Sequence, residues 1–137
     1  MTNFAALFRN CKALTSLDIQ NFDTKSAVYL HYFFDNCQSL TSLNISHFDT
    51  RNVENIGHMF DQCNALASLD LSNFDTTLVT NMDNIFYNCH SMKYLDVSNF
   101  KTEKINNMKW LFIFTRSLLS LNLSSFNIYN TTNLKIY

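Results

Sequence analysis

The chain has 137 residues, of which 47% are hydrophobic, and a formal net charge of −1. This length predicts about one domain, and the large apolar fraction argues against intrinsic disorder. The near-neutral charge gives no general reason to expect nucleic acid or an anionic membrane as partner. No stretch approaches the roughly 18 apolar residues of a membrane span. The first nine residues lack the basic start and apolar run of a signal peptide, so the sequence as given predicts a soluble chain without a visible export signal.

One 26-residue unit recurs along the chain. The cysteines show the period, because Cys11, Cys37, Cys63 and Cys89 are each 26 residues apart. Three further columns keep this spacing through five units: Phe8, Phe34, Phe60, Phe86 and Phe112; Leu17, Leu43, Leu69, Leu95 and Leu121; and Phe22, Phe48, Phe74, Phe100 and Phe126. A fixed period of this length is the signature of stacked coils. We therefore predict one domain over 1–137, with a partial unit at 1–6 and units at 7–32, 33–58, 59–84, 85–110 and 111–137.

Each unit is expected to contain a helix followed by a strand. Asp49 and Thr50 can cap a helix, and the apolar residues that follow them have helical spacing. These residues are Val53, Ile56, Met59, Phe60 and Cys63. The stretch 66–74 then reads L-x-x-L-x-L-x-x-F, with Leu69 and Leu71 alternating with polar residues, which predicts a short strand with one buried face.

Such a unit cannot bury its apolar side alone, but identical units can do so by stacking. The predicted fold is therefore an α/β solenoid. In detail, it is a leucine-rich repeat, right-handed β/α superhelix of about five coils, with parallel strands on one face and short helices on the other.

The repeated block at 59–82 reads M-F-x-x-C-x-x-L-x-S-L-D-L-S-N-F-D-T-x-x-V-T-N-M. It closely resembles the BspA-like leucine-rich repeat surface proteins of bacteria and some protists. This resemblance implies a solenoid exposed on or secreted from a cell, acting as an adhesin or host-contact module without enzymatic activity. The shared positions of that family are structural, so the resemblance transfers no functional residues.

The cysteine column is predicted to hold buried, reduced thiols, because it lacks the paired C-x-x-C spacing of zinc sites. Stacked disulfides between neighbouring coils are the alternative. The histidines His31, His47, His58 and His90 occupy four different columns. His31 and His58 could approach each other, but no carboxylate recurs beside them, so all four are predicted to be surface or packing residues. We expect no metal and no cofactor.

Polar residues line the open face of the predicted strands. One column holds Asp18, Asn44, Asp70, Asp96 and Asn122. Carboxylates and hydroxyls could bind calcium or carbohydrate there, although simple solvation of the sheet face is the favoured interpretation. Tyr94, beside Lys93, replaces serine in a neighbouring column, which indicates either a contact anchor or, as favoured, neutral drift. The candidate ligand contacts are Lys93, Tyr94, Asp70 and Asp96.

Charge is distributed unevenly. Residues 1–90 hold 4 basic and 9 acidic residues, a net charge of −5, whereas residues 91–137 hold 6 basic and 2 acidic residues, a net charge of +4. The last units also carry Trp110, Phe114, Lys104, Lys109 and Arg116, which could form a positive patch. Opposite charge at the two ends predicts end-to-end self-association, whereas the absence of a basic stripe argues against nucleic-acid binding.

Together these patterns predict a non-enzymatic cell-surface or secreted binding module, adhesin-like, which contacts a protein or a host-cell macromolecule. The alternative is an intracellular protein-interaction scaffold. An enzyme is the least favoured class, because no nucleophile, base and orienting group recur together.

Overall fold

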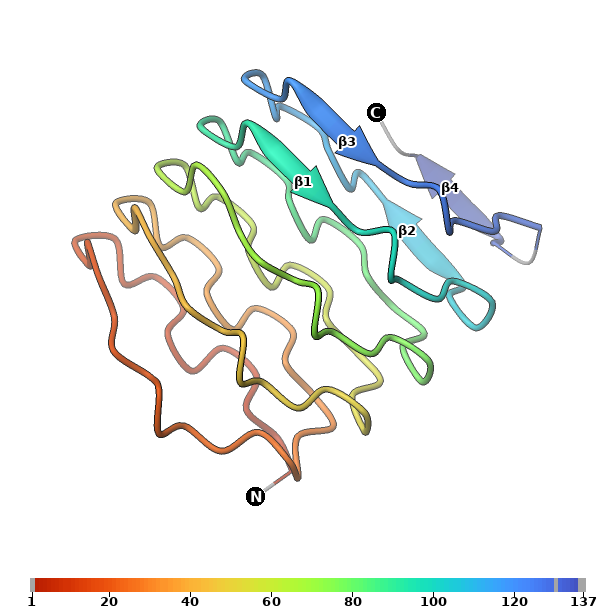
Figure 1. Ribbon diagram of the computed structural model, residues 1–137, viewed down its shortest axis with the longest axis horizontal. Helices are drawn as coiled ribbons and strands as arrows, with labels where there is room; N and C mark the ends of the chain where they lie inside the picture. Colours follow the sequence, from red (N-terminus) through yellow and green to blue (C-terminus); the bar gives the residue numbers. More distant parts are fainter. Residues whose placement is uncertain (1, 130, 136–137) are drawn as a thin grey trace.

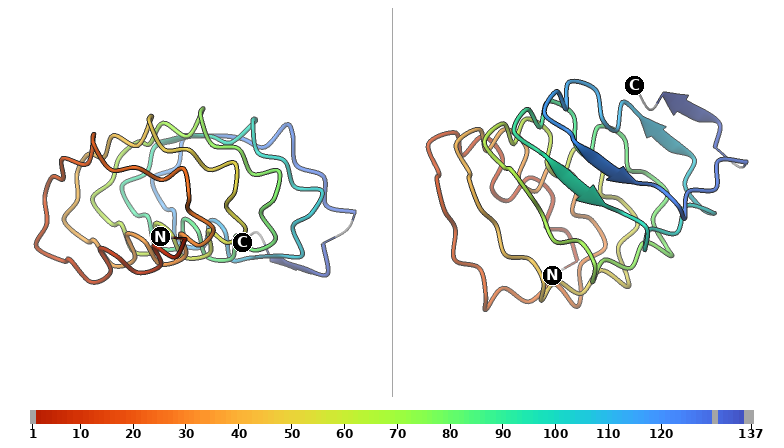
Figure 2. Two further views of the ribbon diagram at one scale, coloured as in Figure 1. Left: turned by 90° about the horizontal axis from the view of Figure 1, so that it is seen from below. Right: turned by 45° about the horizontal axis from the view of Figure 1, so that its top comes forward.

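The computed structural model describes residues 2–129 and 131–135, which form a stack of similar coils in chain order (Figures 1 and 2). It has four short strands: β1 (Tyr94–Asp96), β2 (Asn107–Lys109), β3 (Ser120–Asn122) and β4 (Asn133–Lys135). β1 pairs with β3 and β2 with β4, both in parallel and each in register with the residue 26 positions later. Stacking thus places equivalent residues of successive units side by side.

Isolated bridges continue both rows of strands toward the N-terminus. Ser68 pairs with Tyr94 of β1. In the other row the bridges run through Asn3, Tyr29, Asn55, Asn81 and Asn107. We call the side that carries β1 and β3 the strand face. The side that carries β2, β4 and the turns following them is called the turn face.

The predicted α/β fold class is wrong, because the described residues contain no helix. The turn face, where helices were expected, consists of consecutive turns. Its backbone N–H groups alternate between two kinds of partner. Phe34 N donates to Met59 O of the next coil at 2.9 Å, whereas Asp35 N donates back to Tyr32 O of its own coil at 3.2 Å. A helix would instead use all of these donors internally.

Two backbone positions per unit interrupt the helical conformation. Both have φ between 53° and 64°, the left-handed region, whereas an α-helix needs φ near −63° throughout. The first column contains Ala6, Tyr32, His58, Asn84 and Trp110. The second contains Asn10, Asn36, Gln62, Asn88 and Phe114. Apolar side chains at helical spacing therefore lie on a chain of turns.

Coil spacing explains why helices are excluded. The rings of Phe60 and Phe86 stack with centroids 5.9 Å apart, and those of Phe86 and Phe112 repeat this distance. Packed helices need about 8–10 Å between their axes. Turns fit the narrower spacing and leave every second N–H free to reach the next coil.

Buried threonines connect the coils where the sequence suggested a helix cap. Thr50 Oγ1 donates to Asp75 O at 3.0 Å and accepts from Asp75 N at 2.8 Å. Thr76 makes the equivalent pair with Lys101, at 3.0 and 2.7 Å. Asp49, the other expected cap residue, accepts from Arg51 N within a turn. These threonines satisfy backbone groups of the following coil rather than those of a helix.

The core consists of the repeated apolar columns. Leu69 and Leu71 are buried, whereas Ser68 and Asp70 are exposed, as the alternating pattern predicted. The strand predicted over 66–74 is reduced to an isolated bridge at Ser68. All four cysteines are free thiols, as predicted. Cys37, Cys63 and Cys89 are buried, and each thiol donates to a phenylalanine carbonyl of the preceding coil. Cys11 is only partly buried.

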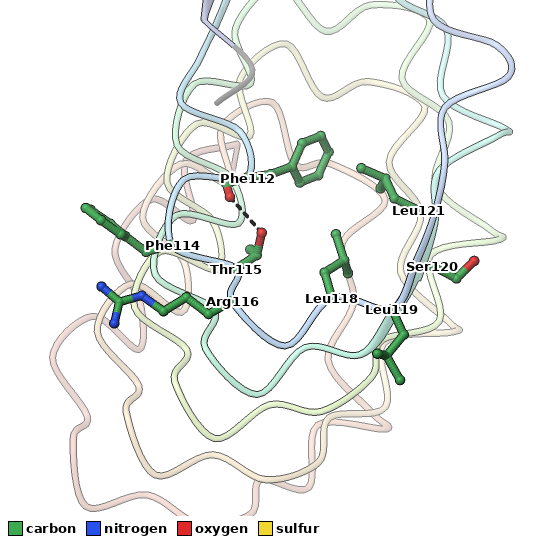
Figure 3. A pocket seen from close by; sticks show the side chains of 8 residues that line it. All are labelled: Phe112, Phe114, Thr115, Arg116, Leu118, Leu119, Ser120 and Leu121. Carbon is green, nitrogen blue, oxygen red and sulfur yellow. Dashed lines mark hydrogen bonds between the residues drawn. The ribbon is translucent and has the colours of Figure 1, made fainter.

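The last complete coil leaves part of the core uncovered. Figure 3 shows Phe112, Leu118 and Leu121 pointing into the coil, whereas Phe114 and Arg116 point away from it. The hollow at this end has a volume of about 480 Å³. The end-to-end self-association expected from the charge distribution stays a prediction.

No helix in the described part of the chain is long and apolar enough to cross a membrane.

Replacing Thr76 with valine should lower the free energy of unfolding by about 1–3 kcal/mol, because the N–H and C=O of Lys101 lose their buried partner. Thr77→Val is the matched control. The Thr77 side chain is exposed, so its replacement should change stability by no more than about 0.5 kcal/mol. Urea unfolding of both variants measures the difference. Equal losses would contradict a role of Thr76 in joining the coils.

In the folded protein, a thiol-alkylating reagent at pH 8 should modify Cys11 well before the other three cysteines. Burial raises the pKa of Cys37 to about 11 and raises the pKa of Cys63 and Cys89 as well, which disfavours the reactive thiolate. Peptide mass spectrometry at successive times gives the order of modification, and urea-unfolded protein serves as the control. Uniform reactivity in the folded state would contradict this burial.

Candidate functional site

The sequence-predicted contacts lie on the strand face. Tyr94 is 58% exposed and is in register with Ser120 of β3. The backbone of Lys93 bonds to Ala67 O and receives a bond from Leu119 N. Leu119, in the same column as Lys93, is 71% exposed. Tyr94, Lys93 and Leu119 therefore form a small exposed patch on adjacent coils.

The candidate acids Asp70 and Asp96 are exposed on the same face, but each is engaged in a local turn. Asp70 Oδ1 accepts from Ser72 N at 3.0 Å and from Ser72 Oγ at 2.7 Å. Asp96 Oδ1 accepts from Ser98 N at 2.9 Å. Hydrogen bonds from the side chains of Ser72 and Ser98, and then from their backbone N–H groups, hold the pKa of Asp70 and Asp96 below the usual value. Asn44 makes the same turn with its amide oxygen, so the column serves the backbone and needs no charge.

A cluster of polar side chains lies on the turn face around His58. His58 Nδ1 is 2.8 Å from Asp61 Oδ2, and Nε2 is 3.4 Å from Asp83 Oδ2. The Tyr32 ring stacks on the imidazole with centroids 4.4 Å apart. Burial opposes the positive charge of His58, but the two carboxylates outweigh it and raise the pKa to about 9.

The sequence showed no carboxylate that recurs beside His31 and His58, but the structure gives His58 two carboxylate partners. Asp61 lies three residues after His58 in the same row of turns, and Asp83 lies in the row of turns that stacks on it. The spacing to Asp83 is one residue short of a full repeat, so the column alignment of the sequence did not pair the two. Burial, and then the charge of His58, lower the pKa of His31.

Arg9 occupies a neighbouring position on the turn face. Its Nε donates to Asp35 Oδ2 at 2.7 Å, and its guanidinium carbon lies 4.4 Å from the centroid of the Tyr32 ring. Here the turn face holds a cation between a carboxylate and an aromatic ring. The carboxylate comes from the column shared with Asp61, and the ring comes from the left-handed column shared with Trp110.

Next to the His58 cluster, the turn face has a hollow of about 310 Å³. Its lining residues are Asp61, Asn84, Tyr87, Trp110, Ile113 and Phe114. Trp110 and Phe114 are 41% and 44% exposed, and the Tyr87 and Phe114 rings meet edge-on with centroids 5.6 Å apart. The sequence suggested these two exposed aromatics as part of a positive patch, but the structure places them around an acidic side chain.

Trp110 and Phe114 also occupy strained backbone positions. Their φ angles are 55° and 63°. Left-handed φ disfavours residues with a Cβ by about 1–2 kcal/mol and is least suited to bulky side chains. In the same two columns, earlier units place Asn84 and Asn88, a residue type that tolerates this conformation. Tyr32 and His58 also occupy the first column, whereas Phe114 replaces the asparagine or glutamine of every earlier unit in the second. The last coil thus carries two large, exposed aromatic side chains in left-handed positions.

Within the described ranges, no group of three histidine, cysteine or acidic side chains could hold a metal ion.

Replacing His58 with asparagine should destabilise the protein in a pH-dependent manner. The pKa of His58 is about 9 in the folded state, above its ordinary value of 6.5, so its stabilising contribution is complete below about pH 6.5. This contribution is lost as the pH rises through about 9. The stability difference between wild type and variant should shrink by up to about 3 kcal/mol from pH 6 to pH 10.

Asparagine is the suitable replacement because Asn84 occupies the same left-handed column. Denaturant unfolding of both proteins across this range measures the effect, and NMR titration of the imidazole reports the pKa directly. A difference independent of pH would contradict a protonated His58 paired with two carboxylates.

Phe114→Asn should leave the protein as stable as wild type or more stable. The change relieves a left-handed bulky residue at a partly exposed site. Phe112→Ala is the control: Phe112 is buried, so its truncation should cost about 3–5 kcal/mol. Thermal unfolding compares the two variants. A large loss in Phe114→Asn would show that Phe114 serves the core rather than the surface.

Comparison with known proteins gives one match. No curated protein and no solved structure matches the chain significantly. A family described as "Mycoplasma protein of unknown function, DUF285" matches residues 1–93 and 62–136. The expected BspA-like assignment is therefore wrong; the repeated phenylalanine, cysteine and threonine positions that suggested it are those used here to stack coils. Because the two matched segments together span nearly the whole sequence, the chain belongs to the DUF285 family.

Proposed function

We propose that this chain is a non-enzymatic binding module that contacts a polypeptide partner through the turn-face hollow. The observation that carries the proposal is the pair Trp110 and Phe114, two large exposed aromatic residues kept in left-handed backbone positions. Strained residues concentrate at functional sites, and exposed aromatics are frequent energetic anchors of protein interfaces.

The use of the repeated polar side chains supports this location. The threonine column joins coils, the column containing Asp70 forms turns, and the buried thiols bond to backbone carbonyls. Contact with a partner is therefore best supplied by residues that break the period. The strand-face patch of Lys93, Tyr94 and Leu119 is a second such place and could extend the contact.

The state of His58 favours binding over catalysis. Both ring nitrogens face carboxylates, Nδ1 toward Asp61 and Nε2 toward Asp83. A pKa of about 9 keeps the ring protonated at neutral pH, so it is a poor general base. Among the described residues, the imidazole contacts Tyr32, Asp61, Asp83 and Asn84. None of these is a serine, threonine or cysteine that it could activate.

We place this contact at a cell surface or outside the cell, with an intracellular scaffold as the rival. The shielding of Cys37, Cys63 and Cys89 supports the surface placement, since buried thiols resist an oxidising environment. Protease treatment of intact source cells separates the two locations. Digestion of the chain without lysis is expected, and complete protection would favour the scaffold.

Binding should be detectable on an array of immobilised random-sequence peptides. Wild-type protein should bind a subset of these peptides, and the double variant Trp110→Asn, Phe114→Asn should lose most of that binding. Tyr94→Ser, which restores the residue type of its column, tests the strand face separately. Failure of wild-type protein to bind any peptide, or unchanged binding by the double variant, would contradict the proposal.

A further inference from the structure

The hollow contains a buried acid with an unused acceptor. Asp61 is 7% exposed, and its Oδ2 bonds to His58 Nδ1. Its Oδ1 is buried and has no hydrogen-bond partner. Burying a carboxylate oxygen without a hydrogen-bond partner is unfavourable. Asp61 is one of the residues that line the hollow, so a donor that enters the hollow approaches this carboxylate.

The charge around the hollow favours a positively charged donor. The charged members of the adjoining cluster are Arg9, Asp35, His58, Asp61 and Asp83. With His58 protonated, the carboxylates outnumber the cations by one. The remaining walls are mainly aromatic, and aromatic faces attract cations through their quadrupole.

The same molecule already shows this chemistry with its own cations. Arg9 lies between the Asp35 carboxylate and the Tyr32 ring, at 2.7 and 4.4 Å. Asp61 is the equivalent of Asp35 one repeat later, and Trp110 is in the column of Tyr32. Arg116 also lies over the Phe114 ring, with its guanidinium carbon 5.4 Å from the ring centroid. One repeat after Tyr32 the column holds His58, so the hollow combines the same kinds of group in a different arrangement, with the Asp61 carboxylate beside aromatic rings that come from later coils.

We propose that the hollow binds the cationic end of a lysine or arginine side chain of a partner polypeptide. Asp61 supplies the opposite charge, and Tyr87, Trp110 and Phe114 supply the aromatic walls. A volume of about 310 Å³ is enough for one such side chain but not for a folded element. This inference rests on the proposed binding function and names the group that is recognised.

Trp110 is the only tryptophan of the chain, so its fluorescence reports directly on the hollow. The probes are short glycine-serine peptides with one central lysine, arginine or norleucine, and tetramethylammonium as a free cation. Lysine or arginine peptide should change the fluorescence saturably and bind at least about tenfold more tightly than the norleucine peptide. High salt should weaken this binding.

Two variants test the recognition independently. Asp61→Asn removes the charge, and Phe114→Asn removes one wall while keeping a residue type suited to left-handed φ. Each variant should weaken the binding of the lysine and arginine peptides at least about fivefold. Asp70→Asn is the matched control, because asparagine already fills that column at Asn44, and it should bind like wild type. Thermal unfolding confirms that each variant is folded.

Several results would overturn the inference. Equal affinity for the norleucine peptide would show that the hollow recognises apolar side chains rather than cations. Full affinity in Asp61→Asn would show that the Asp61 carboxylate takes no part in binding. Binding of tetramethylammonium without binding of the lysine and arginine peptides would assign the hollow to a small free quaternary ammonium ion. If array binding depends on Trp110 but not on basic residues in the peptides, the proposed function stands and this inference fails.

Discussion

The spacing between coils controls most of this structure. Phenylalanine rings of successive units stack with centroids 5.9 Å apart, for example Phe60 on Phe86. At this distance every coil can form backbone hydrogen bonds with the next, as Phe34 N does with Met59 O. Helices cannot pack so closely. The turn face therefore alternates bonds within a coil and bonds between coils, and it needs two left-handed residues per unit to do so.

This construction leaves few side chains free for contact. Threonines such as Thr76, turn-forming acids such as Asp70 and thiols such as Cys63 all serve the backbone. Departures from the repeat are therefore the informative positions. Phe114 departs most strongly, since it replaces asparagine or glutamine and, like Trp110, combines exposure, bulk and an unfavourable φ. We propose that this unfavourable conformation is retained because these residues form a binding surface, on a scaffold whose other repeated polar side chains serve the fold.

Electrostatics on the turn face follow from the same stacking. Asp61 and Asp83 belong to adjacent coils, and close stacking brings both to His58, which raises its pKa to about 9. The positive ring satisfies one oxygen of Asp61 and leaves the other without a partner. An acceptor of this kind beside aromatic walls has the features of a cation site. Arg9 between Asp35 and Tyr32 shows such a site occupied.

The amino-acid sequence by itself determined the 26-residue period, the buried columns and the two-faced segment around Leu69. These features depend on which residues recur, and the recurrence can be read directly from the sequence. Only the tertiary structure decided that the turn face has no helix, because apolar spacing around Met59 is the same on a helix and on stacked turns. It also decided that Asp83 meets His58 and that Trp110 borders Asp61, since both contacts cross between coils off the 26-residue alignment. A local sequence pattern describes contacts within one unit, whereas this site is formed by side chains that come together from neighbouring units.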